Sequence, residues 1–156
     1  MAETTKIDAI DRAILRVLKA DGRIGVAELA ARVGLSQSPV SRRLQRLEDR
    51  GIIKGYAALI DEAALGFGIS VFVSVKLERQ VDDAIAKFER AVRHLPEVVD
   101  CWLMTGNRDY LLRVATSGLP DFERFLTSGL TRIDGVASIE SSIPLRRVKG
   151  DQARID

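Results

Sequence analysis

The chain has 156 residues, of which 46% are hydrophobic and 29% charged, a balance typical of a globular protein with one medium domain or two small ones. No apolar run approaches the roughly 18 residues that a membrane-spanning helix requires, and the polar, acidic start argues against a secretory signal. The chain has one cysteine, Cys101, which excludes an internal disulfide framework and fits a reducing cytosol. With one histidine besides, His94, the chain is not expected to hold a structural zinc site.

The net charge of +2 is unevenly distributed along the chain. Residues 1–60 carry 11 Lys and Arg against 7 Asp and Glu, whereas residues 61–156 carry 13 against 15. Two halves of opposite sign favour two domains, the first of which faces a polyanion. Chance scatter of the charges is the alternative explanation.

The first 50 residues predict three short helices joined by tight turns. Apolar residues recur at helical spacing over residues 8–18, the stretch VAELAARV repeats the pattern at 26–33, and a third helix is predicted for 36–50. Gly34 and Gly51 end the second and third helices because glycine tolerates the left-handed conformation of a helix C-terminus. Three helices of this length form a compact unit around a small core.

The third predicted helix is amphipathic and has a basic polar side. At about 100° per residue, its apolar side chains form one buried stripe, namely Val40, Leu44 and Leu47. Its polar side chains lie opposite that stripe (Ser38, Arg42, Gln45 and Arg46) or flank it (Arg43 and Arg50). Pro39 is tolerated only in the first helical turn, so Ser36 or Ser38 is the expected N-cap. The helix therefore begins in a donor-rich turn whose dipole favours phosphate.

A short bracing helix, a glycine turn and a polar second helix are typical of the helix-turn-helix motif, in which the second helix enters the major groove of DNA. Arginine reads guanine, serine and glutamine bond base edges, and flanking arginines contact phosphates. The stretch IIKGYAALID at 52–61 predicts a strand or hairpin, the wing, from which Lys54 reaches a phosphate. The expected DNA-binding residues are Ser36, Gln37, Ser38, Ser41, Arg42, Arg43, Gln45, Arg46 and Lys54. An ordinary solvated basic face is the alternative interpretation.

The second half of the chain changes to the two-residue period of β-strands. The stretch ISVFVSVKL places its alternate residues on one face, namely Ile69, Val71, Val73, Val75 and Leu77. The segments that follow predict a helix at 81–95, strands at 98–105 and 110–116, a helix at 119–133 and a strand at 136–148. This β-α-β-β-α-β order is that of ferredoxin-like folds, so the predicted fold class is α+β.

Two helices cover only one face of such a sheet. The opposite face carries Phe72, Trp102 and Met104 and is too apolar to leave in water, so we expect a second copy of the sheet to bury it. A two-fold symmetric dimer would also present two recognition helices to a pseudo-palindromic operator. Cys101 is predicted to be a buried strand residue.

Two stretches of the chain resemble the Lrp/AsnC family of bacterial and archaeal transcription regulators, also called feast/famine regulators. They are IDAIDRAILRVLKADGRIGVAELAARVGLSQSPVSRRLQRLEDRGIIKGYAALID and, later, TGNRDYLLRV. The resemblance covers nearly the whole chain. It implies a winged helix-turn-helix at 1–60, a linker at 61–68, a ferredoxin-like ligand-sensing domain (the RAM domain) at 69–150 and a tail at 151–156. It also implies homodimers that assemble further, as tetramers or octamers.

The resemblance further implies that the TGNRDY loop lines an effector pocket at the dimer interface, where small molecules, usually amino acids, bind. Gly106 lets backbone amides approach a carboxylate, and Asp109 accepts from an ammonium group. The implied residues are Thr105, Gly106, Asn107, Arg108, Asp109 and Tyr110, with Gly135, Ser138 and Ser141 contributed by a second copy. Many relatives have aspartate where this chain has Asn107, so the identity of the effector stays open. Without the resemblance, these residues indicate an ordinary hairpin turn, with Tyr110 either in the core or in a pocket wall.

The sequence therefore predicts a sequence-specific DNA-binding regulator, cytoplasmic and associated with the nucleoid, whose DNA affinity changes when an amino acid or related metabolite binds. No metal or other cofactor is expected. Two alternatives stay open. One is an architectural DNA-binding protein without an effector. The other is an enzyme with a ferredoxin-like domain, for which the sequence offers no nucleophile–base pair, metal cluster or phosphate-binding loop.

Overall fold

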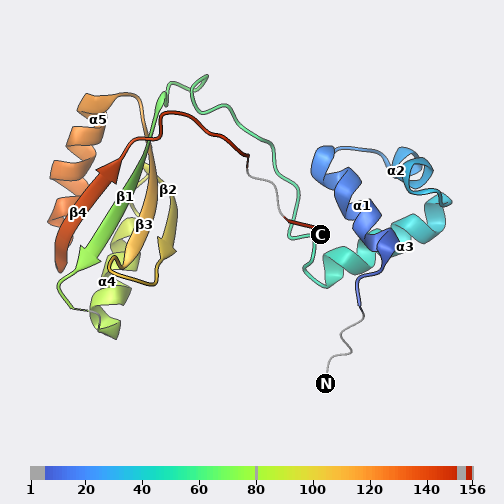
Figure 1. Cartoon of the computed structure of the whole chain (residues 1–156), viewed down its shortest axis with the longest axis horizontal. Coiled ribbons are helices and arrows are strands. Elements are labelled where there is room, and N and C mark those ends of the chain that lie inside the picture. The colour runs from blue at the N-terminus through green and yellow to red at the C-terminus, as the bar shows by residue number, and fades with distance from the viewer. Residues whose placement is uncertain (1–5, 80, 151–153, 156) are drawn as a thin grey trace. The chain divides into compact units, whose positions relative to one another are not determined.

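The computed structural model describes residues 6–79, 81–150, 154 and 155, and the chain divides into two compact units (Figure 1). The first unit is Met1–Leu59 together with Lys149–Asp156, and the second is Ile60–Val148. Of the predicted tail, 151–153 and 156 lie outside the described residues. In the part of the chain that is described, no helix is long and apolar enough to cross a membrane.

The first unit contains three helices, α1 (Ala9–Ala20), α2 (Val26–Val33) and α3 (Gln37–Asp49). Their buried side chains form one small core, namely Ile14, Leu29, Ala30, Val40 and Leu47. Gly34 ends α2 at a φ of 70°, in the left-handed region that glycine adopts without strain. The three predicted helices are confirmed, and the glycine turn delivers the chain directly into α3.

The predicted β-hairpin after α3 is wrong, since the structure assigns no strand between α3 and the second unit. The amides of Ile52 and Ile53 instead both donate to the Leu47 carbonyl oxygen, at 2.9 and 3.1 Å, and both side chains pack against the helical core. Further along, the Tyr56 hydroxyl donates to Glu48 at 2.9 Å, and burial together with that bond raises the pKa of Tyr56 to about 12. The wing position is therefore occupied by an irregular segment that is anchored to α3.

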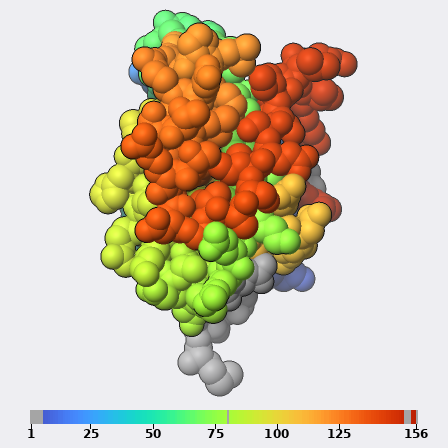
Figure 2. Space-filling view, turned by 90° about the vertical axis from the view of Figure 1, so that its left-hand side faces the viewer, coloured from blue at the N-terminus to red at the C-terminus, as the bar shows by residue number. Residues whose placement is uncertain are grey.

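The second unit is a four-stranded antiparallel sheet with two connecting helices (Figure 1). The elements are β1 (Ile69–Leu77), α4 (Asp82–Val92), β2 (Val98–Leu103), β3 (Tyr110–Thr116), α5 (Leu119–Arg124) and β4 (Val136–Ser142). The strand order is β2-β3-β1-β4, which confirms the predicted ferredoxin-like fold. Figure 2 looks at the β4 edge of the sheet, where β4 and the α5 segment form much of the visible surface.

The core of the second unit lies between one face of the sheet and the helices. As its two-residue period predicts, β1 buries alternate residues, namely Val71, Val73, Val75 and Leu77. They share one cluster with Phe88 and Val92 of α4 and with Phe122, Phe125 and Leu130. Val81 departs from the predicted apolar stripe of α4: it is the N-cap and is 52% exposed.

The chain between α5 and β4 departs from the single helix predicted for 119–133. After α5 the helix widens into a π-helical turn (Phe125–Gly129) and then tightens into a 3-10 turn (Leu130–Arg132). Gly129, at the end of the π-helical turn, lies beside the Leu95 side chain. The last strand, β4, is shorter than the predicted strand at 136–148, since it ends at Ser142.

The predicted linker at 61–68 lies within the second unit. The Asp61 carboxylate accepts from the Ala63 amide at 3.0 Å, and Glu62 pairs with Arg113 of β3 at 2.9 Å. The first contact is a local turn, and the second holds the segment against the sheet. The passage from one unit to the other therefore falls between Leu59 and Ile60, ahead of the predicted linker.

Candidate nucleic-acid interface and effector site

The outer face of α3 carries a stripe of exposed polar side chains. Ser38, Ser41, Arg42 and Gln45 follow the three- and four-residue spacing of one helix face, and all four are exposed. The opposite face is fully buried through Val40 and Leu47. The amphipathic pattern of the sequence placed Ser38, Arg42 and Gln45 on this face correctly. We call these three residues and Ser41 the recognition stripe.

Arg43 and Arg46 do not belong to the recognition stripe, because both pair with aspartates of the first unit. The Arg43 guanidinium donates to Asp8 at 2.6 Å and to Asp11 at 2.7 Å. Arg46 donates to both carboxylate oxygens of Asp11, at 3.0 and 3.1 Å. Because Asp11 is 1% exposed, these pairs tie α3 to the start of α1.

The same two aspartates also cap α1. The Asp8 carboxylate accepts from the Asp11 amide at 2.8 Å and the Asp11 carboxylate accepts from the Asp8 amide, a reciprocal capping box. The Asp11 amide and then Arg43 lower the pKa of Asp8, and Asp8 and then Asp11 raise the pKa of Arg43. Sequence reasoning missed this cluster, although an Asp-x-x-Asp at a predicted helix start signals the cap.

The beginning of α3 is open. Ser36 holds the N-cap position, but its side chain makes no capping hydrogen bond, and both Ser36 and Gln37 are exposed. Pro39 lies in the first turn, as predicted. The first amides of the helix therefore remain available to an anion, and Lys54 beyond the helix is exposed as well.

One contact within the exposed face of α3 is absent from the sequence-based prediction. The Gln45 side-chain amide donates from Nε2 to Asp49 Oδ1 at 2.9 Å, one helical turn further on. Both side chains are exposed. The i, i+4 spacing of glutamine and aspartate is the signal that would have identified this pair.

In the second unit, the predicted effector loop lies between β2 and β3. Asp109 is buried, and its Oδ2 accepts from the Leu77 amide at 2.6 Å. Its backbone amide donates to the Val75 carbonyl oxygen, and its own carbonyl accepts from Met104. The Asp109 carboxylate, predicted to accept from an ammonium group, thus fastens the loop to the end of β1.

Tyr110 packs in the core of the second unit, and it also borders a pocket together with Glu89 and Leu103. Its side chain is 1% exposed, and its ring centroid lies 4.5 Å from that of Phe88. The hydroxyl donates to Glu89 of α4 at 3.2 Å. Burial and then Glu89 raise the pKa of Tyr110, so the phenol stays protonated.

Arg108 connects the loop to β4. Its guanidinium donates to the Ser138 hydroxyl at 2.7 Å and to Glu140 at 2.6 Å. Ser138 and Ser141 lie on opposite faces of the sheet, because Ser138 pairs with Lys76 and Ser141 with the inward-facing Val73. Ser138 therefore lies on the face of the sheet where Arg108 binds it, and Ser141 lies on the other face.

The remaining loop residues are open to solvent or shape the backbone. Thr105 and Asn107 are exposed. Gly106 and Gly135 have φ of 111° and 87°, which favours glycine at both turns. The amides around Gly106 are thus the part of the predicted site that stays accessible.

The sheet face without helices mixes apolar and charged residues. Phe72 pairs with Arg113 and Trp102 with Leu111 across the strands, so these side chains share that face, and Trp102 is 44% exposed. Arg113 also donates to Asp100 at 2.8 Å, and its contacts with Glu62 and then Asp100 raise its pKa. Cys101, predicted to be buried, is exposed at this edge of the sheet.

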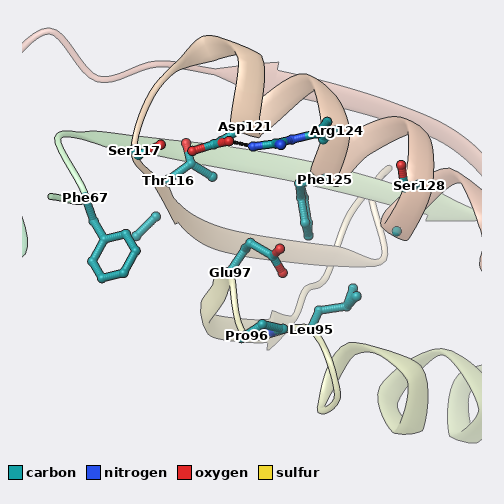
Figure 3. A pocket seen from close by; sticks show the side chains of 12 residues that line it. Phe67, Leu95, Pro96, Glu97, Thr116, Ser117, Asp121, Arg124, Phe125 and Ser128 are labelled. Atoms are coloured by element: carbon teal, nitrogen blue, oxygen red, sulfur yellow. Dashed lines mark ion pairs between the residues drawn. The ribbon is translucent and has the colours of Figure 1, made fainter.

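A groove of about 580 Å³ lies at the end of β2 and β3 opposite the TGNRDY loop (Figure 3). Phe67, Leu95 and Phe125 form its apolar walls, and Figure 3 shows the ion pair of Asp121 and Arg124 along one side. The residues that line it do not include any of the predicted effector residues. The groove and the predicted effector loop are therefore separate features of the unit.

Comparison with known proteins matches both units. Residues 7–54 match a winged helix-turn-helix DNA-binding model, and residues 70–153 match the Lrp/AsnC ligand binding domain. The chain is 47% identical to the Bkd operon transcriptional regulator of Pseudomonas aeruginosa over 92% of this chain and 94% of that protein.

Solved structures of similar proteins match most of the chain. A transcriptional regulator of Neisseria meningitidis in complex with L-methionine is 39% identical and superposes with a TM-score of 0.88, covering 93% of this chain and 94% of the other. A feast or famine regulatory protein of Mycobacterium tuberculosis, also complexed with L-methionine, is 37% identical with a TM-score of 0.84, covering 97% and 100%.

Proposed function

The chain belongs to the Lrp/AsnC family of transcriptional regulators, and on that premise we propose that it reads double-stranded DNA through the recognition stripe of α3 and changes this binding when the second unit holds a small effector. The observation that carries the proposal is that the arginines of α3 differ in their partners. Arg43 and Arg46 hold the helix to α1, whereas Arg42 has no hydrogen bond or ion pair with any described residue.

The proposed DNA contacts follow from this difference. Arg42, Ser38, Ser41 and Gln45 face the base edges, because the helix presents them together on its exposed side. The open first turn with Ser36 and Gln37, and Lys54 beyond the helix, lie where backbone phosphates are contacted in this motif. Arg43 and Arg46 are not proposed as DNA contacts.

The substitution Arg42→Ala tests the DNA-reading role. A duplex selected from a random pool by the wild-type protein serves as operator, and a random-sequence duplex of the same length serves as reference. We expect affinity for the selected duplex to fall about 5- to 150-fold, because one bidentate base contact is lost. Affinity for the random duplex should change far less, and fluorescence anisotropy at several salt concentrations measures both.

Arg93→Ala, which removes an exposed arginine from α4 in the second unit, is the matched control and should leave both affinities unchanged. An equal loss of affinity on the two duplexes after Arg42→Ala would mean that Arg42 contacts only phosphate. That result would contradict its place in base reading.

We further propose that two copies pair through the sheet face without helices, and that an amino acid binds near the TGNRDY loop of this dimer. The exposed Trp102 on that face and the two structural relatives solved with L-methionine support this. The accessible amides around Gly106 suit a carboxylate, whereas Asp109 is committed to Leu77. Assembly into tetramers or octamers, and a cytoplasmic location on the nucleoid, belong to the same proposal. Effector binding would act by shifting the spacing of the two recognition helices or the assembly state.

Thermal unfolding with each of the twenty amino acids tests the effector. We expect at least one apolar amino acid such as L-methionine to raise the Tm by several degrees at about 100 times its Kd, since ligand binding to the folded state adds about 2.7 kcal/mol. D-methionine is the matched control and should have a much smaller effect. Stabilisation by none of the twenty would favour an architectural protein without an effector, and formation of a product would favour an enzyme.

A further inference from the structure

The way Gln45 is held determines which bases it can bond. A free glutamine amide presents its carbonyl and its NH₂ group in either orientation, so it pairs with several base edges. Here Nε2 donates to Asp49 Oδ1 at 2.9 Å along the same helix face. This bond fixes the orientation of the amide and leaves Oε1 and the second N–H to meet an external partner.

This remaining pair of groups matches one base. In the major groove adenine presents the acceptor N7 beside the donor N6 amine, which complements one N–H and one carbonyl oxygen. Guanine presents two acceptors there, so one of them would face Oε1 without a hydrogen. We propose that Asp49 orients Gln45 to read adenine in each operator half-site. The inference rests on the proposed function, because it requires α3 to lie in the major groove.

The spacing along α3 places this adenine relative to the base read by Arg42. Arg42 and Gln45 are three residues apart on the exposed face, which is about 4.5 Å along the helix axis. Successive base pairs rise about 3.4 Å. The adenine bonded by Gln45 therefore lies in a base pair next to the guanine bonded by Arg42.

Asp49 can act on DNA binding in two ways, by orienting the Gln45 amide or through its own negative charge. A carboxylate on the exposed face of α3 repels the phosphate backbone and weakens binding to every sequence alike. If Asp49 orients Gln45, removal of its acceptor oxygen lowers discrimination between bases, whereas removal of its charge alone does not. The substitutions Asp49→Ala and Asp49→Asn differ in this respect, because asparagine retains an acceptor oxygen at the same position.

The experiment begins with selection of preferred duplexes from a random pool by the wild-type protein. Affinities are then measured by fluorescence anisotropy for the selected duplex, for single-base replacements within it and for a random duplex. We expect one adenine per half-site whose replacement by guanine weakens wild-type binding about 5- to 150-fold. Gln45→Ala should abolish that preference while the dependence on the neighbouring guanine remains.

Asp49→Ala should reduce the adenine preference about 2- to 10-fold, the effect of one interfacial hydrogen bond, and Asp49→Asn should retain it. Both variants should bind the random duplex more tightly than wild type at low salt. Helical circular dichroism establishes that each variant is folded.

Two results would overturn the inference while the proposed function stands. One is a selected motif whose adenine preference does not depend on Gln45. The other is an equal change in discrimination after Asp49→Ala and Asp49→Asn, which would mean that Asp49 acts only through its negative charge. If the wild-type protein selects no motif at all, sequence-specific binding itself fails, and this inference fails with it.

Discussion

At the scale of single residues, Asp8 and Asp11 pair with two arginines of α3, and the proposed DNA contacts rest on this distinction from Arg42. A helical wheel places Arg46 on the polar side of α3 and Arg43 at the flank of its apolar stripe, but it contains no information on partners more than 30 positions away in the chain. The two carboxylates reach α3 because the capping box fixes them at the start of α1. The sequence could therefore predict that Arg42 is exposed, but it could not predict that Arg43 and Arg46 pair with aspartates of α1 and its N-cap.

Asp11→Asn tests the structural role of this cluster. We expect the first unit to lose about 2–4 kcal/mol of stability, because two guanidinium groups lose a carboxylate that is 1% exposed. Urea unfolding followed by helical circular dichroism measures the change. Fluorescence of Trp102, the single tryptophan of the chain, reports on the second unit, whose transition should not move.

The matched control for Asp11→Asn is Glu28→Gln, which removes the carboxylate of an exposed ion pair with Arg32 at 2.6 Å. Surface pairs of this kind contribute less than about 1 kcal/mol, so the first unit should barely change. Similar losses for the two substitutions would contradict the structural role of Asp11. They would also return Arg43 and Arg46 to the set of candidate DNA contacts.

At the scale of elements, the regular parts of the fold follow from local patterns. α2 at Val26–Val33 and β3 at Tyr110–Thr116 have the bounds that spacing and turn residues predict. β1 buries every second residue, since a half-buried strand must alternate. These elements could be predicted because the periodicity and the breaking residues agree.

The failures at this scale come from segments where local propensity and tertiary packing disagree. Ile52 and Ile53 have strand propensity, but both amides bond the end of α3 and both side chains complete its core. The π-helical turn at Phe125–Gly129 interrupts a stretch whose apolar spacing predicts a continuous helix, and the sequence pattern does not reveal it.

The candidate effector loop shows a different kind of failure. Its position and its glycine turn were predictable, but the sequence could not tell that Asp109 is buried against Leu77 and therefore committed to the fold. The opposite faces of Ser138 and Ser141, by contrast, follow from their separation of three residues in one strand. That distinction was within reach of the sequence alone.

At the scale of the whole molecule, we propose that assembly joins DNA reading and effector sensing, which belong to different units of the chain. One recognition stripe contacts only one half-site. Two copies held by a symmetric interface would contact two half-sites, and their combined affinity exceeds that of each by a large factor. The sheet face that carries Trp102, Phe72 and Leu111 is the proposed interface, so disruption of this face should weaken operator binding without a change in α3.

Trp102→Glu tests this coupling, because it places a charge on the proposed interface at a side chain that is already 44% exposed and so need not unfold the chain. We expect sedimentation velocity to show monomers at concentrations where wild type is dimeric, and affinity for the selected operator to fall about 100-fold. Leu103→Glu is the matched control: Leu103 is the next residue of β2, is 61% exposed and lies on the opposite face, beside Tyr110. It should leave both the assembly and operator affinity near wild type. If Leu103→Glu dissociates the protein as fully as Trp102→Glu, the effect belongs to the strand rather than to its face, and the proposed dimer is wrong.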